Sequence, residues 1–154
     1  MYPASWWPSA EYNFRSLPEM IKKSAVMEAW LLLWACRIGL WTAPFPKVLA
    51  GVQSCARQWR SARGLSPEQA VAAIQMALSY SWRASCLTQA LAGWIMLTRH
   101  GASSRVRIGV SSPAQHGFRA HAWLEANGRV ILGDEVQEGL GLRDFPVIWT
   151  LPRE

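Results

Sequence analysis

Residues 85–101, SCLTQALAGWIMLTRHG, decide the fold because they contain a complete helix with the signals for both of its ends. Ser85 is a favourable N-cap, and apolar residues then recur at helical spacing. The stretch closes with a basic last turn and Gly101, the natural residue just beyond a helix end. We therefore predict a helix from Cys86 to Arg99 or His100, with Cys86 in its first turn.

The sequence before this stretch predicts three further helices. The run from Glu19 to about Leu40 is apolar on nearly every side, so it should be buried or covered by a partner. A second helix is predicted over residues 46–60. A third begins at Ser66-Pro67-Glu68-Gln69, which fits a capping box with proline in the first position, and runs to about Tyr80. Residues 1–17, rich in proline and tryptophan, are predicted to be irregular.

Beyond Gly101 the apolar period changes from 3.6 to 2, which is typical of strands. Strands are predicted over residues 105–110, 118–126 and 129–133, with Asn127-Gly128 as a type I′ turn between the last two. Residues 145–150 should form an edge strand, since they contain Pro146. Helices followed by an antiparallel sheet predict an α+β fold. We divide it into a helical preface, residues 1–65, and a core, residues 66–154.

Composition limits the classes of function. The chain has 154 residues, 51% of them hydrophobic and 17% charged, which fits one globular domain with a helical preface. Its net charge of +6 is not clustered and accompanies no nucleic-acid motif, so we expect no nucleic-acid partner, while a weak contact with an anionic membrane surface stays open.

Several features predict a cytoplasmic protein. The cysteine count is odd, and residues 1–10 do not resemble a signal peptide. The apolar run from Ala25 to Trp41 contains Glu28 and Arg37 and is shorter than the roughly 20 residues of a spanning helix.

The three cysteines occupy different surroundings. Cys36 lies within the apolar helix and fits a core residue, and Cys55 has no acid or histidine close to it in sequence. Cys86 is at a helix N-terminus, where the helix dipole and free N–H groups lower a thiol pKa and can receive an oxyanion. From position alone, a buried cysteine beside a cap explains Cys86 equally well.

The predicted hairpin supplies a histidine and an acid. A two-residue turn pairs Leu124 with Ile131 and His121 with Asp134. The two residues of each pair share a face of the sheet, with their Cβ atoms roughly 4.5–5.5 Å apart. A carboxylate at that distance can orient the imidazole as a base for a cysteine nucleophile. A bulge would move Asp134 or Glu135 off that face.

The remaining motifs point to no cofactor. His116 fits a loop, and His100 fits a helix C-terminus, where its charge complements the dipole. No cysteine and histidine spacing matches a zinc site, and no phosphate-binding glycine loop occurs, so we expect neither a metal nor another cofactor.

Five motifs follow one another along the second part of the chain. They are Trp82-Arg83-Ala84-Ser85-Cys86-Leu87, the helix end Arg99-His100-Gly101, Ile108-Gly109-Val110, Phe118 to Glu125 (FRAHAWLE) and Gly133-Asp134. In this order they resemble the lasso-peptide biosynthesis leader peptidases, the microcin-processing branch of the transglutaminase-like cysteine protease superfamily, from about Ser66 to Leu151. The resemblance implies a transglutaminase- or papain-like core, in which a nucleophile helix packs on an antiparallel sheet.

The resemblance also implies an activity and partners. It makes Cys86 the nucleophile, His121 the base and Asp134 the acid of a peptidase that removes the leader from a ribosomally made precursor. Candidates for oxyanion or substrate binding are Trp82, Ser85 and Trp123. An asparagine-synthetase-like macrolactam synthetase would then close the ring. Residues 1–65 lack the family's winged-helix-like leader-binding element, so we expect a separate leader-recognition protein.

Two other interpretations stay open. The same three catalytic residues suit a transglutaminase-like amidase or acyltransferase, which differs only in the nucleophile that resolves the thioester. The tryptophans of the first third can instead pack in the core, or dock on a synthetase, a transporter or lipid, as a docking or scaffold subunit of a peptide-maturation complex. These are Trp6, Trp7, Trp30, Trp34 and Trp41.

Overall fold

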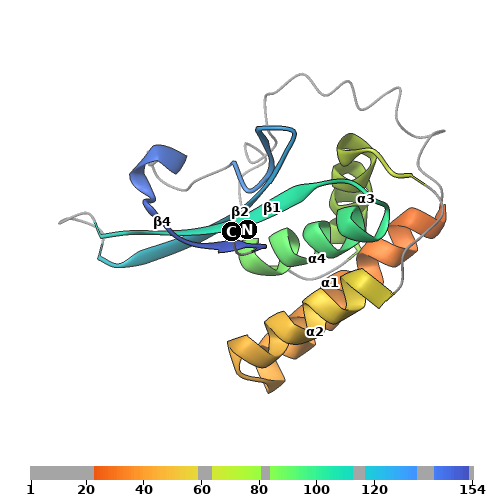
Figure 1. Cartoon of the computed structure of the whole chain (residues 1–154), viewed down its shortest axis with the longest axis horizontal. Helices are drawn as coiled ribbons and strands as arrows, with labels where there is room; N and C mark the ends of the chain where they lie inside the picture. The colour runs from red at the N-terminus through yellow and green to blue at the C-terminus, as the bar shows by residue number, and fades with distance from the viewer. Residues whose placement is uncertain (1–22, 59–63, 81–83, 113–116, 135–140, 153–154) are drawn as a thin grey trace.

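The computed structural model describes residues 23–58, 64–80, 84–112, 117–134 and 141–152. It is an α+β fold, as predicted, with four helices ahead of a four-stranded sheet (Figure 1). The helices are α1 (Lys23–Thr42), α2 (Phe45–Gln58), α3 (Pro67–Ser79) and α4 (Cys86–Arg99). The strands are β1 (Ser104–Ser111), β2 (Arg119–Ala126), β3 (Arg129–Leu132) and β4 (Val147–Leu151), with a 3-10 turn, η1 (Leu142–Asp144), before β4.

Helix α4 occupies the centre of the fold and has the ends that the sequence predicts. The Ser85 hydroxyl accepts a hydrogen bond from the Thr88 N–H at 3.2 Å, and Gly101 follows the helix with φ +79°. One side of α4 contacts β1 and β2, and its other sides contact α1, α2 and α3. Gly93 lets the sheet approach closely, because a Cβ there would lie 2.6 Å from Leu124 Cδ2.

The four strands form one antiparallel sheet in the order β3-β2-β1-β4. Figure 1 shows the sheet on one side and the helices gathered on the other, with α4 alongside the strands. Strand β4 lies at the edge of the sheet, which confirms the prediction made from Pro146.

The register of the β2–β3 hairpin differs from the prediction beyond its first pairs. Ala126 faces Arg129 across a turn in which Asn127 and Gly128 both have positive φ, as expected. A β-bulge then falls between Leu124 and Glu125, and Leu124 faces Leu132 instead of Ile131. The bulge displaces the register by one residue, and the ladder ends at this pair because β3 stops at Leu132. The predicted direct pairing of His121 with Asp134 is therefore wrong.

Helix α1 has a buried side and an exposed side. Its buried residues are Ala25, Ala29, Leu32, Leu33 and Cys36, which contribute to the same core as α3 and α4. The interpretation that the tryptophans of α1 pack into the core is wrong. Trp41 is 85% exposed, and Trp30 and Trp34 are exposed as well. Trp6 and Trp7, and the predictions for residues 1–17, lie outside the described residues.

With 20 residues, α1 is also longer than its apolar run suggested, and by length and composition alone it could cross a membrane. Its acidic residue, Glu28, faces α4, where it pairs with Arg99 Nη1 at 2.6 Å and His100 Nε2 at 3.1 Å. The start of α1 therefore contacts the end of α4. His100 lies at the C-terminus of α4, as predicted. The two helices run antiparallel, so the Trp41 end of α1 points toward the Cys86 end of α4.

Candidate active site

The Cys86 thiol is the first side chain of α4 and is partly buried against the sheet. Burial acts to raise its pKa. Hydrogen bonding with His121 and the backbone N–H groups of Ala122 and Leu87 outweighs that effect, so the pKa of Cys86 is lowered from its ordinary value. The sequence predicted that the helix start would lower the pKa of Cys86, and the contacts with His121 and Ala122 of β2 lower it further.

His121, on β2, is the partner of this thiol. The hydrogen bond with Cys86 raises the pKa of His121, desolvation opposes the rise, and the Gly133 carbonyl supports it, with a net increase. The residue identified from the hairpin thus lies beside the cysteine identified from the helix, although they are far apart in sequence. The predicted nucleophile and base are brought together by the packing of α4 on β2.

The second ring nitrogen of His121 is held by the backbone of the neighbouring strand. Nε2 lies 2.7 Å from the Gly133 carbonyl oxygen. A carbonyl oxygen can only accept a hydrogen bond, so Nε2 carries a proton and Nδ1 is left to exchange one with Cys86. The carbonyl therefore selects the tautomer, which is the role that a carboxylate has in many catalytic triads.

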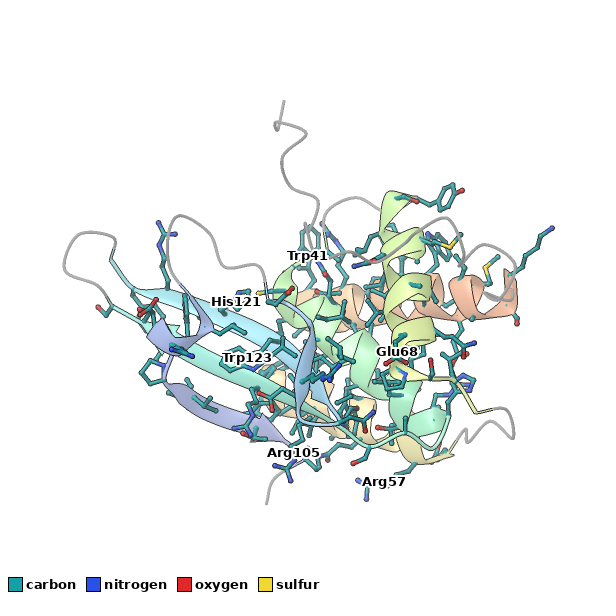
Figure 2. The ribbon with its side chains drawn as sticks, turned by 90° about the horizontal axis from the view of Figure 1, so that it is seen from above. Trp41, Arg57, Glu68, Arg105, His121 and Trp123 are labelled. Carbon is teal, nitrogen blue, oxygen red and sulfur yellow. The ribbon has the colours of Figure 1, made fainter. Side chains whose placement is uncertain are left out.

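Two aromatic rings flank the imidazole of His121. The Trp123 ring stacks on it with centroids 6.2 Å apart and planes inclined by 20°, and the Phe145 ring lies 5.7 Å away at 53°. Figure 2 labels His121 and Trp123 two residues apart on β2. Both aromatic residues are buried, so they fix the plane of the imidazole and limit access of water to it.

Trp123 is itself held by a polar pair on the same sheet. Its Nε1 donates to Glu125 Oε1 at 2.9 Å, and Arg107 Nε donates to Glu125 Oε2 at 2.8 Å. An indole has a single N–H donor, and Glu125 already accepts it. In this arrangement Trp123 orients His121 rather than presenting an oxyanion donor.

Sequence reasoning missed Phe145 and the Gly133 carbonyl. A signal for the first was available in Gly109, because a glycine inside a strand often marks a close approach of another backbone. A Cβ at Gly109 would lie 2.7 Å from the Phe145 carbonyl oxygen. Gly133, with φ +81°, marks a similar approach, since a Cβ there would lie 2.7 Å from the Ala122 carbonyl oxygen.

The other predicted site residues have different placements. Asp134 directly follows Gly133 and is exposed, and the described residues include no hydrogen bond between Asp134 and His121. Its assignment as the catalytic acid stays a prediction. Ser85 acts as the helix cap. Trp82, Glu135 and His116 lie outside the described residues. Within the part of the chain that the structure describes, no three metal-ligating side chains gather into a site.

The geometry of Cys86 and His121 suits acyl transfer. A thiolate at a helix start can attack a carbonyl carbon, and an imidazolium beside it can donate a proton to the departing group. In the first turn the Thr88 N–H donates to the Ser85 cap and the Leu87 N–H to the thiolate, so the Cys86 N–H is the first-turn donor left for the oxyanion that develops during the attack.

Comparison with known proteins agrees with this chemistry. The model of one family, the transglutaminase-like superfamily, matches residues 30–149, from within α1 to within β4. No curated protein matches the chain, and no solved structure matches it. With most of its length matched, and with a cysteine and histidine joined as cysteine peptidases and acyltransferases require, the chain belongs to the transglutaminase-like superfamily.

Proposed function

We propose that this protein is a cysteine peptidase that removes the leader peptide from a ribosomally made lasso-peptide precursor. The observation that carries the proposal is the contact of the Cys86 thiol with His121, which lowers one pKa and raises the other. Superfamily membership supports the reaction class. The choice of substrate rests on the resemblance of the motifs around Cys86, His121 and Asp134 to the leader peptidases.

The first half of the proposed reaction forms a thioester. Cys86 Sγ, as thiolate, attacks the carbonyl carbon of the scissile peptide bond, and the negative charge moves to the carbonyl oxygen. When the C–N bond breaks, His121 Nδ1 donates its proton to the departing nitrogen. This step releases the core peptide with a free N-terminal amine and leaves the leader bound to sulfur.

The second half hydrolyses the thioester. His121 Nδ1, now neutral, takes a proton from water as its oxygen attacks the thioester carbonyl. The C–S bond breaks, the leader departs with a new carboxyl group, and the thiolate–imidazolium pair is restored. Throughout both halves, the Gly133 carbonyl keeps the proton on Nε2, and we assign to the adjacent Asp134 a supporting negative charge for the imidazolium.

The proposed partners follow from the same resemblance. A separate leader-recognition protein would present the precursor, and a macrolactam synthetase would use the amine that cleavage frees. The reaction needs no cofactor, because the nucleophile, the base and water complete its balance. We place this reaction in the cytoplasm, where ribosomal precursors are made.

Mass spectrometry of a cognate precursor, incubated with this protein and its leader-binding partner, tests the proposal. We expect the intact precursor to be replaced by leader and core fragments. Cys86→Ala should abolish cleavage, whereas Cys55→Ala, a matched change at a cysteine outside the site, should retain it. If Cys86→Ala cleaves as fast as the parent protein, the assignment fails.

The superfamily match favours a second function equally well at the level of chemistry, namely transfer of the acyl group to an amine. The thioester is the same, and only the nucleophile that resolves it differs. Repeating the incubation with and without a primary amine distinguishes the two. A carboxyl-terminated leader in both conditions supports the peptidase, and an amide-linked product that requires the amine supports the transferase.

A further inference from the structure

The exposed side of α1 is a continuous apolar strip. After Lys23, every exposed residue of this helix is uncharged, and only Ser24 and Thr42, near its ends, are polar. Leu31 and Ile38 are each 55% exposed, and Trp41, labelled in Figure 2, is the most exposed. We call the large members of this side the α1 strip: Met27, Trp30, Leu31, Trp34, Ile38 and Trp41.

Helical spacing places the whole α1 strip on one face. Its members recur at intervals of three and four residues, and neighbours at this spacing lie next to one another on a helix surface. The acid of the helix, Glu28, is turned away toward Arg99 and His100 of α4. The other charged residue between Met27 and Trp41 is Arg37, which is partly buried and lies at the edge of the strip, so the exposed members themselves are all apolar.

The exposed area of the strip falls short of a standard protein interface. At roughly 200 Å² for a fully exposed large side chain, the six members together expose about 650 Å². A specific protein interface needs about 800 Å² from each partner. A second copy of this chain bound through the α1 strip alone would bury less than this area, whereas a lipid surface requires no complementary shape.

The composition and charge fit the interface of an anionic bilayer. Tryptophan prefers the headgroup level of a membrane, because its ring is apolar and its N–H is polar. The chain carries a net charge of +6, and Lys23, one turn before Met27 at the start of α1, is exposed. Anionic lipids attract such residues.

We propose that α1 binds this protein to the surface of an anionic lipid bilayer, with the α1 strip inserted at the headgroup level. The helix lies on the membrane rather than crossing it, because its opposite side is packed on α3 and α4. This binding is separate from the proposed peptidase reaction, so a failure of one leaves the other standing.

Co-sedimentation with lipid vesicles tests the proposal. We expect the protein to sediment with vesicles of phosphatidylcholine and phosphatidylglycerol, with tryptophan emission shifted to shorter wavelength, and to bind vesicles of phosphatidylcholine alone at least tenfold more weakly. Added salt should weaken the binding, since it screens exposed charges.

Variants separate the α1 strip from other exposed apolar residues. The double change Leu31→Ser and Ile38→Ser should weaken binding to anionic vesicles at least tenfold while circular dichroism and the melting temperature show an intact fold. Ile148→Ser is the matched control, since Ile148 is 63% exposed on β4, and it should bind like the parent.

Two results would overturn the proposal. One is parent protein that stays in the supernatant with both kinds of vesicle. The other is a concentration-dependent dimer in sedimentation velocity that the double change abolishes, which would make a second copy the occupant of the strip. Cleavage of precursor without vesicles tests the peptidase function independently of either result.

Discussion

The Cys86 thiol and the His121 imidazole each change the proton affinity of the other. Their contact stabilises the thiolate and the imidazolium together, so the cysteine titrates lower and the histidine higher than either would alone. The Gly133 carbonyl adds to this effect from the far side of the ring. Reactivity at the scale of single residues therefore depends on one side-chain pair and one backbone group.

Alkylation by iodoacetamide near neutral pH should modify Cys86 first. Its thiolate is stabilised, whereas burial raises the pKa of Cys36 to about 12 and leaves that thiol protonated. Peptide mass spectrometry over time measures the order. Cys36 should react only after unfolding. Rapid labelling of Cys55 with an inert Cys86 in folded protein would count against the site.

The cleavage rate should fall on both sides of a pH window. The lowered pKa of Cys86 means that thiolate is lost only when the pH falls through that value, and the raised pKa of His121 means that imidazolium is lost when the pH rises through it. We expect kcat/KM to decline in acid and again in alkali. In His121→Ala, the pH at which Cys86 becomes alkylated should rise. An acid limb that stands at the ordinary thiol pKa of about 8.5 would contradict the ion pair.

Asp134→Asn should lower the cleavage rate about tenfold, which corresponds to about 1.4 kcal/mol. Loss of the carboxylate in a triad where it sets the histidine tautomer costs about 10⁴ in rate, but here the Gly133 carbonyl sets the tautomer. Single-turnover cleavage rates of Asp134→Asn and His121→Ala measure the difference, and the histidine variant should be far slower. If a folded Asp134→Asn variant lost more than about 10³ in cleavage rate, the result would indicate a direct hydrogen bond between the Asp134 carboxylate and the His121 imidazole.

Among the elements, α4 and β2 hold the reaction centre. The helix supplies the thiol at its start, and the strand supplies the histidine and the stacked Trp123. Both ends of α4 are fixed, by the Ser85 cap at one end and by the Arg99 ion pair and the His100 hydrogen bond with Glu28 of α1 at the other. The position of Cys86 thus depends on how well the first turn of α4 is capped.

Ser85→Ala should lower the free energy of unfolding by about 1 kcal/mol, the usual effect of removing an N-cap side chain. Ser66→Ala removes the equivalent hydrogen bond, from the Gln69 N–H, at the start of α3 and should have a similar effect on stability. Urea denaturation measures both. Only Ser85→Ala should also slow alkylation of Cys86. Equal alkylation rates in both variants would show that the cap does not position the thiol.

At the scale of the whole molecule, the described residues form one core that joins the helices to the sheet. Buried residues of all four helices and of the sheet belong to a single cluster. The cluster continues across the boundary that we placed between residues 65 and 66, and the family match also begins before it, at residue 30. The boundary itself stays a prediction. The distance between Cys86 and His121 is set by the contact between these two layers.

Gly93→Ala should destabilise the fold by about 1–3 kcal/mol, because the new methyl group would press against Leu124 and Leu132 between α4 and the sheet. Activity should fall further than stability requires, since separating the layers separates Cys86 from His121. Gly51→Ala is the control, with no atom near its Cβ on α2, and should stabilise by about 0.5–1 kcal/mol. Thermal unfolding and cleavage rates measure both variants. A Gly93→Ala variant with the stability and cleavage rate of the parent would refute the close contact between α4 and the sheet.

The sequence by itself determined the local structure around the site. The capping box at Ser66, the cap at Ser85, the glycine at 101 and the turn at Asn127-Gly128 all occur as predicted, because these signals act within four or five residues. The same local reasoning identified Cys86. His121 was singled out by its predicted pairing with Asp134 across the hairpin, a register that the bulge changes, and by the resemblance of the motif around it.

Only the tertiary structure decided which groups complete the site and which face stays exposed. The bulge beside Leu124 changed the register, and the packing brought the Gly133 carbonyl and Phe145 to His121. Periodicity shows that Trp30, Trp34 and Trp41 share a side of α1, yet it does not show what covers that side. The physical reason is that a repeat specifies which residues of one element point together, whereas burial and register depend on a second element distant in sequence.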